Sequence, residues 1–460
     1  MSTSLEAPAR PGQSRREETP DVYPHVPRWL SLLFYLYVVT WYLQIGSRIA
    51  FLGAMRFEFF LGSFLVIAAC FVGAELRSSL LVFVAFYLMA LFIQLPFSAD
   101  FDSSWQTFVN RLVKFSMMAL FITVFVKNPR HLLLFLGAFL LACMKIGQEG
   151  LVGVITGGAM WQNQGVMRLH GSTGLYGHPN SLAGNALGSL PFVFYLFPIS
   201  NLAGRIALLV QAGLAFNILM FTGSRTGYIG FFGMAGYALC RAHKRFRTLL
   251  LIALIVVAAA YLVPGEYIER FHSIFTLQER EGHSAQTRLL ILKDGWQIVL
   301  RYPMGVGISA FPKVRQEMFG RYQDTHNLYL EVATNLGIQG FVAFFFLVFK
   351  MMRHLGQLRA GFADQKADVL AALCRIPAGT DHRRSAESHL LDLRLMEATS
   401  AAIRMFIFAR LVVGIFGMDL YEIYWWFALG LTLALTNLDR HARKRTSELS
   451  LAVPAVSSPE

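Results

Sequence analysis

The chain has 460 residues, of which 55% are hydrophobic and only 15% are charged. Soluble domains average roughly 25% charged residues, so this composition excludes an ordinary soluble protein and indicates one that lies in a lipid bilayer. The net charge of +13 does not indicate a nucleic-acid-binding protein, because the Lys and Arg residues flank hydrophobic segments, as the positive-inside rule expects of a membrane protein.

Hydrophobic segments long enough to cross about 30 Å of hydrocarbon recur along the whole chain. A polar segment, residues 1–28, precedes them and is too long and too acidic for the start of a signal peptide, so we expect a disordered cytoplasmic tail. The predicted fold class is an all-α integral membrane protein with about twelve transmembrane helices. These helices are expected near 29–46, 57–74, 79–96, 107–126, 131–150, 181–199, 205–221, 226–241, 247–264, 327–350, 400–417 and 420–437.

The distribution of Lys and Arg predicts the orientation of these helices. Alternate connections are basic, whereas the short connections 97–106 and 418–419 contain neither residue. We therefore expect both termini on the cytoplasmic side and the segments 151–180 and 265–326 outside. The chain then divides into helices one to nine in 29–264, an outer lid in 265–326, helix ten in 327–350, a cytoplasmic segment in 351–398, helices eleven and twelve in 399–437, and a cytoplasmic tail in 438–460.

The predicted lid is long enough to contain helices of its own. Ser284 suits the N-cap of a helix that runs to about Leu300, because the apolar residues that follow it fall at helical spacing. Pro303 would end that helix, and Pro312 suits the first turn of a second one. The lid is therefore expected to be mostly helical.

The cytoplasmic segment 351–398 is mixed in charge and is interrupted by Pro-Ala-Gly-Thr at 377–380. Residues 385–395 are amphipathic, which is typical of a helix that leads into the next span. We interpret the segment as a solvated connector, with a regulatory or partner-binding role as the alternative. The four cysteines lie outside the predicted outer loops, so we expect no disulfide and no cysteine metal site; they are Cys70, Cys143, Cys240 and Cys374.

The sequence Thr-Gly-Ser-Arg-Thr-Gly at 222–227 stands at the outer end of a predicted helix. The N–H groups at a helix N-terminus attract anions, and the glycines would let a phosphate come close to the backbone. Arg225 adds a planar cation that suits bidentate recognition of phosphate. The alternative for this residue is an interfacial arginine that reaches lipid headgroups.

Two further candidates are expected on the same outer side. Arg288 would lie in the first turn of the lid helix, where the alternative is an ordinary solvated arginine. His326 would lie where the span 327–350 begins; its neutral imidazole can accept a proton, and a helix N-terminus disfavours the imidazolium. Asp324 would act on its pKa in the opposite direction or orient the ring, so the sequence leaves the direction of the net shift open, and the alternative role is that of an amphipathic residue at the membrane interface. The candidate catalytic residues for diphosphate chemistry are therefore His326, Arg225 and Arg288, with His170, His178 or Glu331 as the alternative bases.

We predict no metal site and no cofactor. The acidic pair Asp100 and Asp102 lies in an outer loop, but a pattern this short is commonplace and is usually solvated. His170 and His178 lack the spacing of metal ligands on one element. The arginines would take the place that a metal ion fills in other diphosphate enzymes.

From about Arg168 to Phe349 the chain resembles the bacterial O-antigen ligase and O-antigen polymerase superfamily. Each matching motif is weak alone, and the order, spacing and common side of the motifs carry the resemblance. They are Thr-Gly-Ser-Arg-Thr-Gly at 222–227, Arg288, Tyr302-Pro303, Gly305-Val306-Gly307, Thr325-His326-Asn327-Leu328-Tyr329-Leu330 and Gly337-Ile338-Gln339-Gly340.

The resemblance implies a metal-independent glycosyltransferase with a glycosyltransferase-C-like architecture and a large helical periplasmic loop. Such proteins lie in the bacterial inner membrane and transfer a glycan from undecaprenyl diphosphate to an acceptor hydroxyl on the periplasmic side, in lipopolysaccharide or exopolysaccharide biosynthesis. By this resemblance, Arg225 and Arg288 bind the diphosphate and His326 is the base. Four neighbours in the matching block are expected to contact substrate: Arg168, Ser224, Asn327 and Tyr329.

The expected partners are the lipid-linked donor, a glycolipid or glycan acceptor, and membrane lipids, with no nucleic acid. An acceptor on lipid A-core would make the protein a ligase, a second lipid-linked glycan would make it a polymerase, and a protein hydroxyl would make it a protein oligosaccharyltransferase. The rival from another class is a polysaccharide transporter or flippase. That class calls for ionisable residues in mid-bilayer and often for a repeated half, and no internal repeat is visible here.

Overall fold

The structure is a computed structural model that describes residues 23–75, 77–163, 165–242, 245–246, 249–250, 253–254, 257, 261, 264–276 and 284–451. The helices of the first part are α1 (Arg28–Leu43), α2 (Ile45–Arg48), α3 (Ala50–Ala54), α4 (Phe57–Val72), α5 (Leu80–Gln94), α6 (Phe101–Thr107), the π-helix η1 (Phe108–Val113), α7 (Lys114–Phe125) and α8 (Pro129–Thr156). A hairpin follows, in which β1 (Met160–Asn163) pairs antiparallel with β2 (Val166–Leu169). The later helices are α9 (Pro179–Leu196), the 3-10 helix η2 (Phe197–Ile199), α10 (Leu202–Phe221), α11 (Arg225–Arg241), α13 (Gly265–Thr276), α14 (Ser284–Arg301), α15 (Phe311–Phe319), α16 (Leu328–Leu373), α17 (Asp381–Val413) and α18 (Ile423–Leu451).

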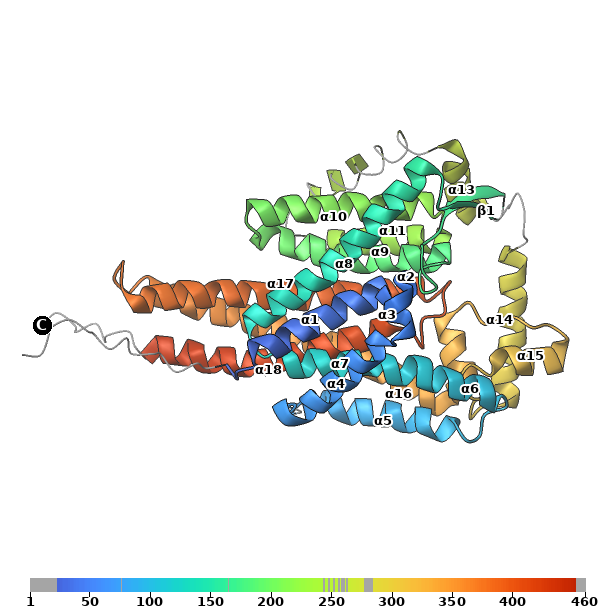
Figure 1. Ribbon diagram of the computed structural model, residues 1–460, viewed down its shortest axis with the longest axis horizontal. Helices are drawn as coiled ribbons and strands as arrows, with labels where there is room; N and C mark the ends of the chain where they lie inside the picture. Colours follow the sequence, from blue (N-terminus) through green and yellow to red (C-terminus); the bar gives the residue numbers. More distant parts are fainter. Residues whose placement is uncertain are drawn as a thin grey trace, which may run out of the picture.

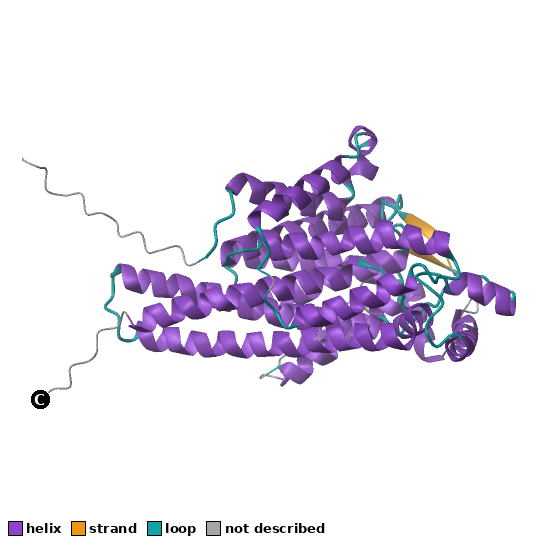
Figure 2. Cartoon of the chain, turned by 90° about the horizontal axis from the view of Figure 1, so that it is seen from below, coloured by secondary structure: helices purple, strands orange, loops and turns teal. Residues whose placement is uncertain are grey.

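The long helices run side by side as a bundle, and the shorter elements gather at one end of it (Figure 1). The β1–β2 hairpin, α13, α14 and α15 lie at this end, which we call the lid end. At the opposite end α16, α17 and α18 extend beyond the other helices, as Figure 2 also shows. The expected all-α framework is therefore present, and the hairpin is an addition that the sequence did not predict.

The surface and length of the helices make this a membrane protein. Five helices among the described residues are long and apolar enough to cross a membrane: Phe101–Phe125, α8, α9, α10 and α16. Large apolar side chains such as Phe71, 86% exposed, cover the outside of the bundle, as a lipid-facing surface requires. A helix is found at every predicted span except 247–264, most of which lies outside the described residues, as do most of the tail 1–28 and residues 452–460. The total of twelve crossings stays a prediction.

The segment 351–398 is more ordered than the solvated connector that we expected. α16 continues to Leu373, and α17 begins at Asp381 after an N-cap by Thr380, whose hydroxyl accepts from the N–H of Arg383 at 3.3 Å. Buried side chains continue the apolar stripe of each helix past the bundle, including Leu358, Phe362 and Leu393. Because α18 packs against both helices, the three form one extension rather than a loop.

The glycine motifs of the chain mark a junction between the lid and α16. The N–H groups of Val306 and Gly307 donate to the carbonyls of Thr334 and Asn335 at 2.9 and 3.0 Å, and α16 kinks at Gly337, whose φ is +68°. A Cβ on Gly337 would lie 2.6 Å from the backbone nitrogen of Gly305, so the two backbones meet with no room for a side chain. This junction fixes α14 relative to the first turns of α16.

Candidate functional site

The turn between α10 and α11 presents the first candidate arginine. Ser224 is the N-cap of α11: its hydroxyl accepts from the N–H of Gly227 at 3.1 Å and donates to Asn180 Oδ1 at 2.9 Å. Gly223 takes a left-handed φ of +55°, which lets the chain reverse before the helix. Arg225 therefore lies at the first position of α11, half-buried, where the helix dipole is positive.

Two further arginines hold this turn. Arg168 on β2 is only 2% exposed; its Nε donates to the carbonyl of Thr222 at 2.8 Å and one terminal nitrogen donates to Asn180 Oδ1 at 3.0 Å. Arg270 on α13 donates from Nε to the carbonyl of Gly223 at 2.6 Å. Three elements distant in sequence thus bring arginines to one helix N-terminus.

The charges of these arginines act on one another. Burial lowers the pKa of Arg168, and the neighbouring charges of Arg270 and Arg225 lower it further. Arginine has so high an ordinary pKa that Arg168 stays protonated at neutral pH. Three guanidinium groups at a helix N-terminus create the positive potential that a phosphate or diphosphate prefers.

His326 and Arg288 come together in a second group. His326 has a left-handed φ of +46° and directly precedes Asn327, which caps α16 by accepting from the N–H of Leu330 at 2.9 Å. The guanidinium of Arg288 on α14 stacks over the ring of Phe416, 5.6 Å from its centroid. Asn327 Nδ2 donates to the carbonyl of Ile415, next to Phe416, at 2.8 Å, so the same loop holds both segments.

The surroundings of His326 keep its imidazole neutral. Burial lowers the pKa of His326; the carboxylate of Asp324 opposes this, and the charges of Arg288 and Arg315 add to it. The pKa therefore lies below its ordinary value near 6.5, so the ring is available as a proton acceptor at neutral pH.

His178 connects the two groups. It caps α9, and its Nδ1 accepts from the N–H of Asn180 at 3.2 Å. Burial lowers the pKa of His178, and the charge of Arg168, together with that of His326 whenever its ring is protonated, lowers it further, so His178 lies within electrostatic reach of both. The lid end thus holds a series of residues in which each interacts electrostatically with the next: Arg225, Arg168, His178, His326 and Arg288.

The four residues that we expected to contact substrate make hydrogen bonds within the protein in this structure. Arg168, Ser224 and Asn327 make the bonds described above, and the Tyr329 hydroxyl donates to the carbonyl of Leu411 at 2.9 Å. Such bonds orient the segments that carry Arg225 and His326. Direct contact between any of the four and a substrate stays a prediction.

Sequence reasoning missed two arginines of this region, Arg270 and Arg315. Arg270 lies one turn after Tyr267, whose hydroxyl donates to the carbonyl of Met167 at 2.7 Å, so both side chains reach the hairpin and the turn. Their i, i+3 spacing on an amphipathic helix was the available signal. Arg315 forms a buried ion pair with Asp294, Nε to Oδ2 at 2.9 Å, between α15 and α14.

The acidic pair has a structural role for one of its members. Asp100 caps α6, since its carboxylate accepts from the N–H and the hydroxyl of Ser103 at 3.4 and 2.9 Å. Within the ranges that the structure describes, no three His, Cys, Asp or Glu side chains are grouped so as to hold a metal ion.

The comparison with protein families gives a match over part of the chain. Residues 211–345 match the family model described as O-antigen ligase, a stretch that contains Arg225, Arg288 and His326 together with the glycine junction. No curated protein matches the chain. Residues 211–345 of this membrane protein are thus similar to the O-antigen ligase family, whose members are glycosyltransferase-like enzymes.

Proposed function

We propose that the protein transfers a glycan from undecaprenyl diphosphate to an acceptor hydroxyl at the periplasmic face of the inner membrane. The observation that carries the proposal is the convergence of Arg168, Arg225 and Arg270 on the N-terminus of α11. His178 interacts electrostatically with Arg168 and with His326, and His326 interacts with Arg288. A lipid diphosphate is an anion that can enter a membrane protein laterally from the bilayer. Its two phosphates suit recognition by planar guanidinium groups.

The residues divide the reaction between them. The bond from the anomeric carbon to the diphosphate oxygen breaks, a bond from that carbon to the acceptor oxygen forms, and the acceptor proton passes to the neutral imidazole of His326. Arg225 and Arg288 bind the diphosphate and stabilise the charge that grows on it as it leaves. Arg168 and Arg270 position the turn that carries Arg225. Because the arginines neutralise the leaving group, this mechanism uses no metal ion.

We favour the ligase type, with a glycolipid acceptor, because the matched family carries that description. Polymerase and protein oligosaccharyltransferase activities would use the same donor site and differ only in the acceptor. Purified protein in vesicles should therefore be given one lipid-linked glycan and, in separate reactions, lipid A-core, a second lipid-linked glycan and a hydroxyl-bearing peptide. Movement of the lipid-linked glycan across the vesicle membrane without transfer to any of them would support the flippase alternative.

Variants separate donor binding from chemistry. Arg225→Ala and Arg288→Ala should each weaken binding of the lipid-linked donor, with only partial rescue by lysine, which lacks the planar fork. His326→Ala should bind donor normally and transfer about 10²–10⁴-fold more slowly. Arg301→Ala, an exposed arginine at the end of the same helix as Arg288, is the matched control. Normal transfer by a correctly inserted His326→Ala protein would remove His326 as the base.

A further inference from the structure

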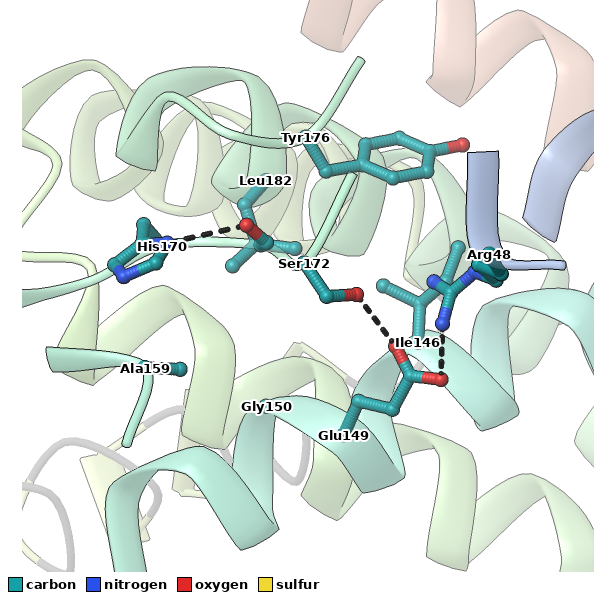
Figure 3. A pocket seen from close by; sticks show the side chains of 10 residues that line it. Arg48, Ile146, Glu149, Gly150, Ala159, His170, Ser172, Tyr176 and Leu182 are labelled. Carbon is teal, nitrogen blue, oxygen red and sulfur yellow. Dashed lines mark hydrogen bonds and ion pairs between the residues drawn. The ribbon is translucent and has the colours of Figure 1, made fainter. Parts of the chain in front are cut away.

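Polar side chains at the lid end bind one another, whereas a row of apolar side chains on the lid is exposed. Glu149, near the outer end of α8, accepts from Arg48 at 2.6 Å and from the hydroxyl of Ser172 at 3.0 Å (Figure 3). On α14, by contrast, Trp296 is 62% exposed and Leu300 is 66% exposed. An exposed apolar surface of this kind marks contact with a protein partner or with a membrane.

Four large apolar side chains recur on one side of α14 at spacings of three and four residues. All four are exposed, and we call them the lid stripe: Leu289, Leu292, Trp296 and Leu300. Ile291 and Ile298 are fully buried and pack with residues of α15 and the start of α16. Because a helix turns by about 100° per residue, these two isoleucines lie on roughly the opposite side from the lid stripe. A surface helix of a soluble protein needs only one apolar side, and α14 has two.

The lid stripe leads onto the lipid-facing surface of the bundle. The carbonyl of Met304, just after α14, accepts from Gln339 Nε2 on α16 at 2.6 Å and from the side chain of Gln94 at the end of α5. Three apolar side chains at this meeting point are exposed: Met304 itself, Ile338 next to Gln339, and Phe97 soon after Gln94. The exposed apolar surface therefore continues from the lid onto α5 and α16, whose outer faces contact lipid.

The direction of α14 suits the surface of a membrane. In Figure 1, α14 runs across the direction of the long helices at the end of the bundle. Because those helices include the candidate membrane spans, α14 lies close to the plane of the bilayer. A helix in this position buries its apolar side by about 5–10 Å and keeps basic side chains among the headgroups. Lys293 and Arg301 are exposed on α14, and tryptophan, here Trp296, is enriched at this depth.

We propose that α14 is an interfacial helix whose lid stripe inserts into the leaflet of the bilayer at the lid end. Acyl chains cover the lid stripe, and phosphate headgroups contact Lys293 and Arg301. Insertion holds Arg288, near the start of the same helix, at the level of the lipid headgroups. The inference stands on α14 and its neighbours and does not rest on the proposed function.

The test identifies what surrounds individual positions of α14. The four native cysteines are replaced, single cysteines are given a nitroxide spin label, and the protein is placed in nanodiscs of phosphatidylcholine and phosphatidylglycerol. Electron paramagnetic resonance then compares collisions with O2, which concentrates in lipid, and with a nickel chelate, which stays in water. Trp296→Cys and Leu300→Cys should resemble Phe86→Cys on the lipid-facing side of α5. The matched control is Gln297→Cys, exposed on another side of α14, which should resemble Gln357→Cys on the extension of α16.

Two results at Trp296→Cys and Leu300→Cys would overturn the proposal. Frequent collision with the nickel chelate would place the lid stripe in water, and infrequent collision with both reagents would show that protein covers it. A charge in the lid stripe gives a second measurement: Trp296→Asp should shift the label at Leu300 towards the nickel chelate, whereas Gln297→Asp should not. An unshifted label would also contradict insertion. None of these measurements uses a substrate, so failure of glycan transfer would leave the result unaffected.

Discussion

Arg168 and Arg270 hold consecutive carbonyl groups of one turn, Thr222 at 2.8 Å and Gly223 at 2.6 Å. The two arginines come from β2 and from α13, so the hairpin and the start of the lid are both bound to the turn that directly precedes α11. A charge-assisted hydrogen bond to a carbonyl is stronger than a neutral one. The position of Arg225 therefore depends on two other cations, which also add to the positive potential at the helix N-terminus.

Arg270→Ala should weaken donor binding although Arg270 does not belong to the catalytic group that the sequence indicates. Loss of its bond to Gly223, worth roughly 1.5 kcal/mol, corresponds to about a tenfold loss in affinity for the lipid-linked donor. Arg270→Lys should restore the charge and little of the turn geometry. Affinity is measured beside that of Ile268→Ala, an exposed neighbour on α13. Unchanged donor binding in both Arg270 variants would show that the turn keeps its shape without α13.

Gly337→Ala should disrupt the docking of the lid on α16. The alanine would be placed at a φ of +68°, which costs about 1–3 kcal/mol for a residue with a side chain, and its Cβ would collide with the backbone of Met304 and Gly305. The expected result is a lower thermal midpoint in detergent together with loss of transfer, since α14 would no longer hold Arg288 beside His326. Gly236→Ala on α11, where a Cβ meets no atom within 4 Å, should behave as wild type.

The sequence predicts the helices of this fold well because long apolar runs have few alternatives in a bilayer. The predicted lid helix from Ser284 to about Leu300 is found as Ser284–Arg301, and the break at 377–380 separates α16 from α17. The hairpin escaped prediction because four-residue strands carry too short an alternation to recognise. The sequence did not predict the extension of α16 and α17, because the charged residues of this segment alternate with its apolar ones and make the continuous buried stripe hard to recognise.

The sequence likewise predicted some residues of the candidate site and not others. Arg225, Arg288 and His326 were indicated by local motifs, namely a glycine-flanked turn and two predicted helix starts. Arg270 and the linking position of His178 depend on which helices meet in space, and no local pattern encodes that. The motif Gly305-Val306-Gly307 was noticed in the sequence, but its reason, a backbone junction with α16, became visible only when both partners were placed.

Transfer should survive chelation. We expect the activity of the wild-type protein to be unchanged by EDTA, because the proposed mechanism neutralises the diphosphate with arginines. Asp100→Asn should keep activity and lose only part of a helix cap, worth roughly 1 kcal/mol or less. The measurement is the initial rate of transfer with and without EDTA, followed by addition of magnesium or manganese. Restoration of a lost rate by either ion would refute the metal-independent mechanism.

The acid limb of the pH profile should identify His326 as the base. The neutral imidazole is the active form, and burial with the charges of Arg288 and Arg315 lowers the pKa of His326, so the limb should lie below the ordinary histidine value near 6.5. The carboxylate of Asp324 favours the imidazolium and thus opposes the lowering of the pKa of His326.

Asp324→Asn should therefore move the acid limb to lower pH. The side-chain oxygen of asparagine can still accept from the N–H of Thr325, as the carboxylate does at 2.7 Å, which preserves the turn. Arg288→Gln should move the limb to higher pH, in addition to weakening donor binding. The quantity to compare is the position of the limb in kcat/KM, which reports the free enzyme, rather than its height. A limb that stays in place in both variants would belong to another group, and His178, which lies within reach of both His326 and Arg168, would be the next histidine to replace.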